Sequence, residues 1–166
     1  MKHIDDLKSR VDQFAPGRNV RIYVTEAGWP VYQGSHGVSD DTAAAYLQRF
    51  MLLAKARPWI AGVWWYDLFD DGDDSQNTEH RFGLLSKAGT PRPAFQALAD
   101  LKPILTSAGA PTLATEANGQ ITVSGQRTDG KRFTVKWLAT NDFIAKQASG
   151  AVGAKPLIRL DAQQAQ

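Results

Sequence analysis

The sequence predicts an α/β fold in which a parallel sheet is covered by helices and followed by a small antiparallel β element. Three observations lead to this fold class. Apolar residues recur at helical spacing in three segments, and two nearly continuous apolar runs between them are typical of buried parallel strands. From about residue 108, apolar residues alternate over short segments instead. The order helix, strand, helix, strand, helix is typical of βα units.

The first helix and first strand lie within residues 1–26. The helix ends at Pro16-Gly17, and its apolar residues recur every three or four positions: Ile4, Leu7, Val11 and Phe14. The strand is predicted over 20–26, where β-branched residues alternate with larger polar ones. Gly28 and Pro30 stop this strand, since glycine frees the backbone and proline lacks a donor.

The second helix, second strand and third helix follow in order. Ser39 is expected to cap the second helix, whose apolar stripe is Tyr46, Phe50, Leu53 and Ala54. The second strand is predicted over 60–68 and runs into an acidic loop at 70–74. A turn over 89–93 starts the third helix, whose stripe is Phe95, Leu98, Leu101 and Leu105.

A change of pattern divides the chain into two predicted parts. Residues 1–105 form the α/β part, and residues 106–166 form a β-hairpin or β-sandwich-like appendage with a polar tail. The hairpin turn is Thr-Asp-Gly-Lys at 128–131, because Asp-Gly tolerates the positive φ that such a turn requires. Its strand residues are Ile121 and Val123 on one side and Phe133, Val135 and Trp137 on the other.

Composition excludes several classes of function. The 166 residues carry 19 basic and 17 acidic side chains without basic clusters, so neither nucleic acid nor a membrane is a predicted partner. The absence of cysteine excludes disulfides and thiolate metal sites. No apolar run approaches the roughly 18 residues of a membrane span, and no apolar core of a signal peptide follows Met1. No metal or cofactor is predicted, because no phosphate-binding glycine loop or ligand spacing is present.

The main candidate for chemistry is Glu26, at the carboxyl end of the first strand. In parallel α/β proteins this edge of the sheet is where active sites collect. By alternation, Glu26 is expected on the same face as Ile22 and Val24. A carboxylate there can act as nucleophile, base or metal ligand. On these residues alone, a salt-bridged acid at a strand end is an equal alternative.

Aromatic residues near the strand ends are candidates for binding a flat, hydroxylated ligand such as a sugar ring. They are Trp29, Trp64 and Trp65, and core packing is the alternative for each of them. His36 and His80 lack ligand spacing, so surface or hydrogen-bonding roles are expected. The acidic run at 70–74 does not follow an EF-hand and is expected to be a solvated loop.

Three motifs follow one another along the chain. They are Thr25-Glu26-Ala27-Gly28-Trp29-Pro30, Val63-Trp64-Trp65-Tyr66-Asp67-Leu68, and Glu79–Leu85 followed by Pro91-Arg92-Pro93-Ala94-Phe95. In order, they resemble the seventh strand, the eighth strand and the end of the (β/α)8 barrel in clan-A retaining glycoside hydrolases, which include families 5 and 39. Arg92 stands where lysine is common. The resemblance covers roughly residues 1–105, and the remainder resembles a β segment appended in relatives of family 39.

The resemblance implies an activity and roles for individual residues. In that clan the glutamate of the seventh strand is the catalytic nucleophile, which corresponds to Glu26. A tryptophan of the eighth strand supports the sugar, and Trp65 is the better match while Trp64 is the second. Trp29, Tyr66 and His36 are the other candidates for substrate binding. The implied reaction is hydrolysis of β-linked poly- or oligosaccharide by double displacement, with a second carboxylic acid about 5–5.5 Å from the nucleophile.

The chain departs from the clan because the acid/base residue belongs to a fourth strand, which this sequence does not contain. A full barrel needs about 250 residues and eight βα units. Neither Glu79 nor Glu116 stands at a strand end where it would replace that acid. The chain is therefore expected to be the carboxyl-terminal portion of a barrel, about strands seven and eight, from a secreted or periplasmic parent enzyme. Alone, it is expected to have little or no activity.

An open two-stranded sheet would expose strand edges and apolar helix faces. The chain is therefore expected to be a fragment of a longer gene, or to complete its fold by self-association or by pairing with an amino-terminal half-barrel. The alternative function is a carbohydrate-binding or scaffold protein that keeps the aromatic platform without catalysis. A non-functional remnant is the third reading.

Overall fold

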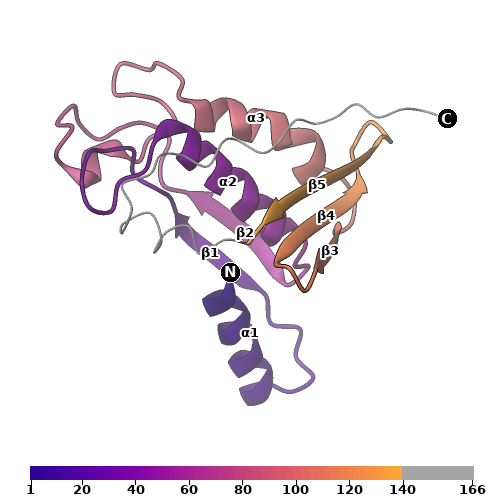
Figure 1. Cartoon of the computed structure of the whole chain (residues 1–166). Coiled ribbons are helices and arrows are strands. Elements are labelled where there is room, and N and C mark those ends of the chain that lie inside the picture. The colour runs from indigo at the N-terminus through magenta and orange to yellow at the C-terminus, as the bar shows by residue number, and fades with distance from the viewer. Residues whose placement is uncertain (140–166) are drawn as a thin grey trace.

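The fold is α/β, as predicted, and contains two separate sheets (Figure 1). The structure, a computed structural model, describes residues 1–139. Its elements are α1 (Lys2–Phe14), β1 (Ile22–Ala27), α2 (Asp40–Lys55), β2 (Ile60–Trp65), the 3-10 helix η1 (Thr78–Arg81), α3 (Pro93–Leu105), β3 (Thr112–Thr115), β4 (Gln120–Gln126) and β5 (Arg132–Leu138). The order predicted for the first part is confirmed, and the predicted tail at 161–166 lies outside the described residues.

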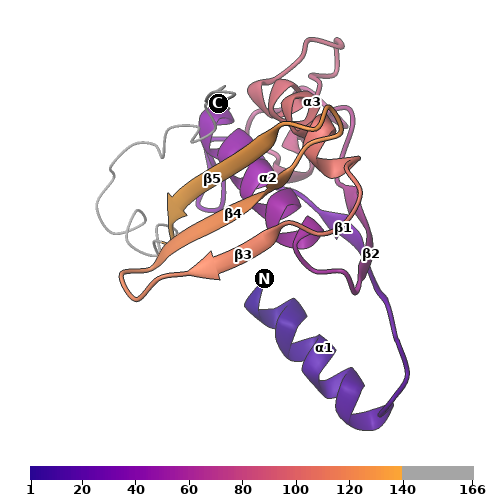
Figure 2. The same ribbon diagram turned by 90° about the vertical axis from the view of Figure 1, so that its right-hand side faces the viewer.

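The first sheet is a parallel pair of β1 and β2, and the second is the antiparallel sheet β3-β4-β5. The predicted hairpin joins β4 and β5, with Gly130 at a positive φ of 81° in the turn. Strand β3 was not predicted. Helices α2 and α3 pack against each other, and α2 is the helix that packs on β2, while α3 lies on the far side of α2 from the parallel pair (Figures 1 and 2).

The two helices bury part of each predicted stripe, Ala54 in α2 and Leu101 in α3, but their other buried positions differ from the prediction. In α2 the largest fully buried side chains are Leu47 and Leu52. Each is the sequence neighbour of a predicted residue, Tyr46 or Leu53. In α3 the buried face is Ala94, Ala97, Leu101 and Ile104, whereas the predicted Phe95 is 37% exposed. Alanines on both helices allow α2 and α3 to approach each other closely. The faces that carry these small side chains are therefore the buried ones.

A single hydrophobic core continues across the predicted boundary at residue 105. Leu101 and Ile104 of α3 belong to the same buried cluster as Val123, Phe133, Val135 and Trp137 of the small sheet. The predicted alternation in β5 is confirmed, since its buried and exposed residues alternate along the whole strand. The division at residue 105 stays a prediction, but the small sheet is not packed separately from the helices.

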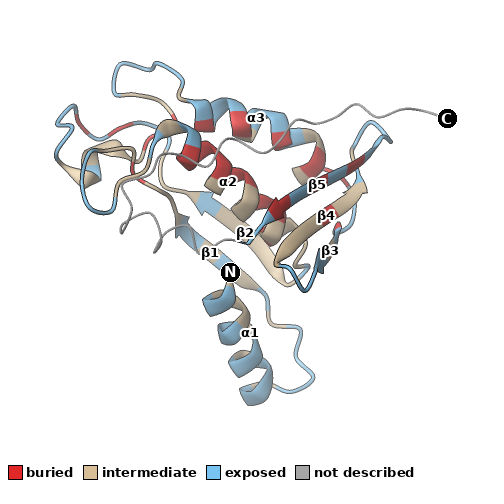
Figure 3. Ribbon diagram, viewed as in Figure 1, coloured by how far each residue is buried: buried red, intermediate tan, exposed pale blue. Residues whose placement is uncertain are grey.

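The other face of the β1–β2 pair carries exposed aromatic residues. Tyr23 is 57% exposed and Trp64 is 54% exposed, with their ring centroids 6.1 Å apart. Figure 3 shows buried residues concentrated on α2, α3 and the small sheet, while β1 and α1 carry none. We call this uncovered side of β1 and β2 the open face.

Helix α1 projects from the rest of the structure and buries none of its residues (Figure 1). Phe14 at its end is 88% exposed. The helix is tied to the body by Asp5, whose two carboxylate oxygens accept hydrogen bonds from Arg57 at 2.6 and 2.8 Å. Hydrogen bonding to the Arg57 guanidinium lowers the pKa of Asp5 below its ordinary value of 3.8.

We expect Asp5→Asn to detach α1 from the body without unfolding the core. The pKa of Asp5 is lowered in the folded chain. The stabilisation that Asp5 gives to the attachment of α1 is therefore complete above pH 3.8 and is lost as the pH falls further. Cleavage by trypsin at Arg10 and Arg18 at neutral pH should therefore be faster in the variant. Asp6→Asn is the matched control, since Asp6 pairs with Lys2 on the exposed side of the same helix. Equal cleavage of both variants would contradict this role of Asp5.

Candidate active site

Two residues of β1 lie opposite one residue of β2 near the carboxyl ends of these strands. Val24 is paired with Val63 and Ala27 with Trp65, so Thr25 and Glu26 together face the single residue Trp64 between them. This arrangement is a β-bulge, which re-aims side chains and is frequent next to active sites. Thr25 and Glu26 are both exposed.

The bulge corrects the predicted orientation of Glu26. Strict alternation places Glu26 on the face of Val24, but the extra residue in the bulge reverses alternation beyond it. Val63 and Trp65 pack against the helix core, and their partners in β1 lie on that side. Glu26 instead lies on the open face, next to Trp64 and on the same side as Tyr23.

The tryptophans at the strand ends are divided between the two faces. Trp65 and Trp29 lie on the helix side with ring centroids 5.6 Å apart, and Trp29 also contacts Tyr46 at 5.4 Å and Phe50 at 5.9 Å. Trp65 packs against the hydrophobic core, whereas Trp29 contacts aromatic rings of α2, and the predicted role of both indoles in substrate binding stays a prediction. Trp64 is the tryptophan that the structure brings beside Glu26 on the open face.

Tyr66 lies directly after β2 and is joined to the end of β1. Its backbone N–H donates to the carbonyl of Ala27 at 2.8 Å, and its hydroxyl donates to Asp71 at 3.1 Å, which raises the pKa of the phenol. Its ring contacts Phe82, and the Tyr66–Asp67 peptide bond is cis. A Cβ at Gly28 would lie 2.0 Å from the Tyr66 carbonyl oxygen, so only glycine fits at this contact.

His36 is exposed and lies in the loop between β1 and α2. No hydrogen bond within residues 1–139 links His36 to Glu26. His80 packs over the backbone of Gly72 in the acidic loop, at a distance where a Cβ would lie 2.3 Å from its Nδ1. The predicted role of His36 in substrate binding stays a prediction.

The acidic loop is not fully solvated, because its first residue is buried. Asp70 is 4% exposed, and its carboxylate accepts hydrogen bonds from Arg92 at 2.5 Å and from the Gly83 amide at 2.9 Å. Arg81 lies 3.5 Å from the same carboxylate, and Arg92 also reaches Asp40 at 3.1 Å. These contacts hold the loop against the starts of α2 and α3. The sequence analysis did not predict this role of Arg81 and Arg92. For Arg92, its position between two prolines at the start of α3 was the available signal.

Asp67 is partly buried at the same edge of the sheet. Burial, followed by repulsion from Asp71 and Asp70, raises the pKa of its carboxyl above 3.8. We expect Asp67→Asn to raise the melting temperature at neutral pH, because the folded chain then no longer holds an ionised, poorly solvated carboxylate. The gain should shrink as the pH falls and vanish below about 3.8, where Asp67 is protonated in both states. Thermal melts of both proteins between pH 3 and 7 test this, roughly spanning the titration of a carboxyl group.

The control for that experiment is Asp73→Asn in the same loop, because Asp73 is exposed and pairs with Lys87 at 3.5 Å on the surface. An exposed pair contributes less than about 1 kcal/mol. An Asp67 variant that is less stable than the wild type at neutral pH would contradict the role of burial.

Neither a metal site nor a membrane span is present in the described part of the chain. Within residues 1–139, no three His, Asp or Glu side chains are grouped so as to hold a metal ion. No helix in this range is both long and apolar enough to cross a bilayer.

Comparison with known proteins finds glycoside hydrolases among the similar sequences. The chain is 32% identical over 80 residues to basic isoform 1 of glucan endo-1,3-beta-glucosidase from Solanum tuberosum, covering 46% of this chain and 23% of that protein. It is equally identical to the basic vacuolar isoform of the same enzyme from Nicotiana tabacum, covering 46% and 21%.

Solved structures give the same class. A family 39 glycoside hydrolase from the gut symbiont Bacteroides cellulosilyticus WH2 matches with a TM-score of 0.58 and 31% identity, over 72% of this chain and 24% of that one. A family 5, subfamily 18 protein from Bifidobacterium longum subsp. infantis matches in fold, with a TM-score of 0.50 and 20% identity over 60% and 23%. No protein-family model matches. The resemblance to clan-A glycoside hydrolases is confirmed, and the chain spans about a quarter of the length of these relatives.

Proposed function

We propose that this chain supplies the seventh and eighth strands of a (β/α)8 retaining glycoside hydrolase that acts on β-linked glucan in its complete form. The bulge at Thr25–Glu26 is the observation that carries this proposal, because it turns the carboxylate to the side of the sheet that the helices leave uncovered. In a closed barrel, that side is the interior, and side chains at the carboxyl ends of its strands meet at the active site. We also propose that the parent enzyme is secreted or periplasmic.

In this reaction Glu26 attacks the anomeric carbon and forms a covalent glycosyl intermediate, which water then hydrolyses. Trp64 is the sugar platform in this proposal, in place of Trp65, because its indole is exposed on the face of Glu26 while Trp65 packs against the helix core. An aromatic face binds the C–H side of a pyranose ring, and a polar tip can remain solvated.

The second carboxylic acid of a retaining mechanism must come from elsewhere in the barrel. Glu79 belongs to η1, and Glu116 lies in the turn between β3 and β4, where it accepts a hydrogen bond from Gln120 at 2.8 Å. Neither position is on the open face. Without an acid to protonate the leaving oxygen, the glycosidic bond is not cleaved at a useful rate.

We expect the purified 166-residue chain to release no detectable glucose from a β-1,3-glucan oligosaccharide, because a sugar leaving group, unlike nitrophenol, must be protonated by the missing acid. This assay also tests the fragment reading, since the missing acid is the reason for the expected inactivity. Retaining hydrolysis by the chain alone that disappears in Glu26→Gln would contradict the proposal that the acid lies outside it. The product anomer, followed by NMR, distinguishes retention from inversion.

A carbohydrate-binding protein without catalysis is the second candidate function. The exposed pair Tyr23 and Trp64 favours it, because a sugar platform is present on the open face without an acid beside it. Under this reading Glu26→Ala leaves the affinity for a β-1,3-glucan oligosaccharide almost unchanged in a calorimetric titration, whereas Trp64→Ala weakens it. A loss of affinity in Glu26→Ala comparable to that in Trp64→Ala favours the hydrolase instead.

A further inference from the structure

The side chain of Trp64 leans back along β2 over Gly62, which lies two positions earlier in the strand. A Cβ at Gly62 would lie 2.8 Å from Cζ3 and 3.0 Å from Cη2 of the indole. The outer edge of the six-membered ring therefore takes the space of a missing side chain. Residues two apart in a strand share one face, and their side chains usually stand off the sheet. The indole leans because position 62 is empty.

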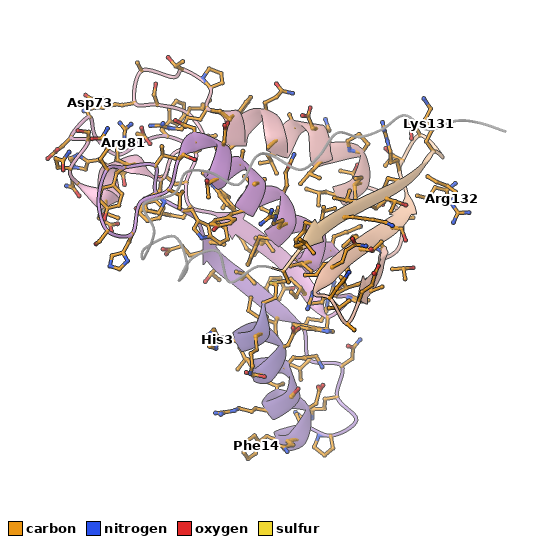
Figure 4. All side chains as sticks on the ribbon, in the orientation of Figure 1. His3, Phe14, Asp73, Arg81, Lys131 and Arg132 are labelled. Atoms are coloured by element: carbon orange, nitrogen blue, oxygen red, sulfur yellow. The ribbon has the colours of Figure 1, made fainter. Side chains whose placement is uncertain are left out.

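The lean is directed away from the loops at the carboxyl ends of the strands. In Figure 4, Arg81 and Asp73 mark the segment that follows β2, and Phe14 of α1 lies at the other end of the molecule. Because Gly62 precedes Trp64, the outer edge of the indole points from the carboxyl end toward the middle of the strand.

Space, and not backbone conformation, is what requires glycine at position 62. Gly62 is not one of the glycines with a positive φ in residues 1–139, so its backbone conformation is open to any residue. Glycine in the interior of a strand weakens that strand and often marks a close approach of another group. Here the three atoms nearest to an added Cβ all belong to Trp64 and Tyr23.

Tyr23 closes the other side of the hollow above Gly62. It is the residue of β1 that pairs with Gly62, and its ring would lie 3.5 Å from the added Cβ. The rings of Tyr23 and Trp64 are tilted by 43° at a centroid distance of 6.1 Å, within the range in which aromatic rings attract each other. The indole is therefore supported by a strand backbone and by a second ring while it stays exposed to a ligand.

The contact does not involve the core. Val63 and Trp65 pack against the helix core, so alternation places Gly62 on the open face with Trp64. A methyl group at position 62 would meet the free end of the indole side chain, which can rotate about its own bonds. The ring would swing away and the backbone would stay in place. The strand would keep its fold while the indole changed its tilt.

From these observations we infer that Gly62 is a positioning residue for the sugar platform. By leaving room for the outer edge of the indole, it sets the tilt of Trp64 and the distance at which a sugar ring on that indole stands from Glu26. The inference rests on the proposed function, in which Trp64 carries the sugar and Glu26 attacks it. A misplacement of about 1 Å can lower the rate of a reaction about a hundredfold, so one methyl group at this position should have a measurable effect.

The first measurement tests the contact in the full chain without a ligand. We expect nuclear Overhauser effects between the α protons of Gly62 and the protons on Cζ3 and Cη2 of Trp64. In Gly62→Ala, the indole N–H signal of Trp64 should shift because the ring has moved. Ala61→Gly is the matched control, since it changes one methyl group on the opposite face of the same strand and should leave that signal in place.

The second measurement is an NMR titration of the same proteins with a β-1,3-glucan oligosaccharide, up to roughly 10 mM because a millimolar Kd corresponds to only about 4 kcal/mol. Gly62→Ala should raise the Kd about tenfold, or about 1.4 kcal/mol, and Ala61→Gly should not. Trp64→Phe keeps an aromatic face but has no second ring to reach over position 62. Adding Gly62→Ala to Trp64→Phe should therefore change the Kd no further, which a double-mutant cycle measures.

The possible outcomes separate the role of Gly62 from the proposed function. A loss of affinity in Gly62→Ala that disappears in the Trp64→Phe background supports the inference. Absent Overhauser effects, or wild-type affinity in Gly62→Ala, overturn it and leave the proposed function intact. An equal loss in both backgrounds also overturns it, because Gly62 would then act through the fold and not through the indole. If the wild-type chain does not bind the sugar at all, Trp64 is not the platform, and both proposals are overturned.

Discussion

Replacing Glu26 by glutamine is expected to lower kcat at least about a thousandfold in a completed barrel, which corresponds to about 4 kcal/mol of transition-state stabilisation. Glutamine keeps the size of the side chain but is not a nucleophile towards the anomeric carbon, so no glycosyl intermediate forms. The effect should appear in kcat and in kcat/KM together, since the lost interaction exists only along the reaction path.

A completed barrel can be made by replacing the matched 24% of the family 39 enzyme from Bacteroides cellulosilyticus WH2 with residues 1–139 of this chain, because the match covers 72% of this chain. Thr25→Val is the matched control, since Thr25 is the other exposed residue of the same bulge. In the chimera with Glu26 intact, a 2-deoxy-2-fluoro glycoside with a good leaving group should add its mass to the peptide that contains Glu26. Unchanged kcat in Glu26→Gln, with the label on another residue, would show that Glu26 is not the nucleophile.

Replacing Trp137 by alanine is expected to remove about 3–5 kcal/mol from the free energy of unfolding, the usual cost of emptying a large aromatic site in a core. Trp137 is 5% exposed and belongs to the cluster that contains Leu101 and Ile104 of α3. The helices should therefore melt at a lower denaturant concentration even though the substitution lies in β5. Circular dichroism at a wavelength dominated by helix measures this effect directly.

Lys136→Ala is the matched control, because Lys136 is the exposed neighbour on the other face of β5. It should change stability by less than about 0.5 kcal/mol. If the helix signal of Trp137→Ala melted at the wild-type midpoint while the strands unfolded earlier, the small sheet would be a separate unit, as the division at residue 105 predicts.

The elements of the first part could be predicted because each carries its own local signal. Ser39 caps α2 as expected, with its hydroxyl accepting from the Thr42 amide at 3.2 Å, and the Asp-Gly turn joins β4 to β5. The motif at 25–30 likewise identified the strand end that carries the candidate carboxylate. These features depend on residues within a few positions of one another.

The faces of the elements could not be predicted, because they depend on partners far away in sequence. Nothing in residues 20–30 alone indicates a bulge, which arises from the pairing of Val24 with Val63 and of Ala27 with Trp65. Adjacent tryptophans in β2 necessarily point to opposite faces, and only the positions of α2 and α3 decide which of them is covered. The burial of Asp70 follows in the same way from Arg92, 22 positions further along the chain.

The shared core also bears on how such a chain can be recombined. A crossover at residues 106–111 would take Leu101 and Ile104 from one parent and Val123 and Trp137 from another. The two halves of one core would then come from proteins whose side chains are not matched to each other. Interiors of this density respond to the change of even a single methylene group. Hybrid enzymes made at that junction should therefore fold only when the two parents match in side-chain volume across it, whereas crossovers in the loop between α1 and β1, at 15–21, leave the core intact. In recombination between genes, the helix pair and the small sheet should therefore be exchanged together as one segment.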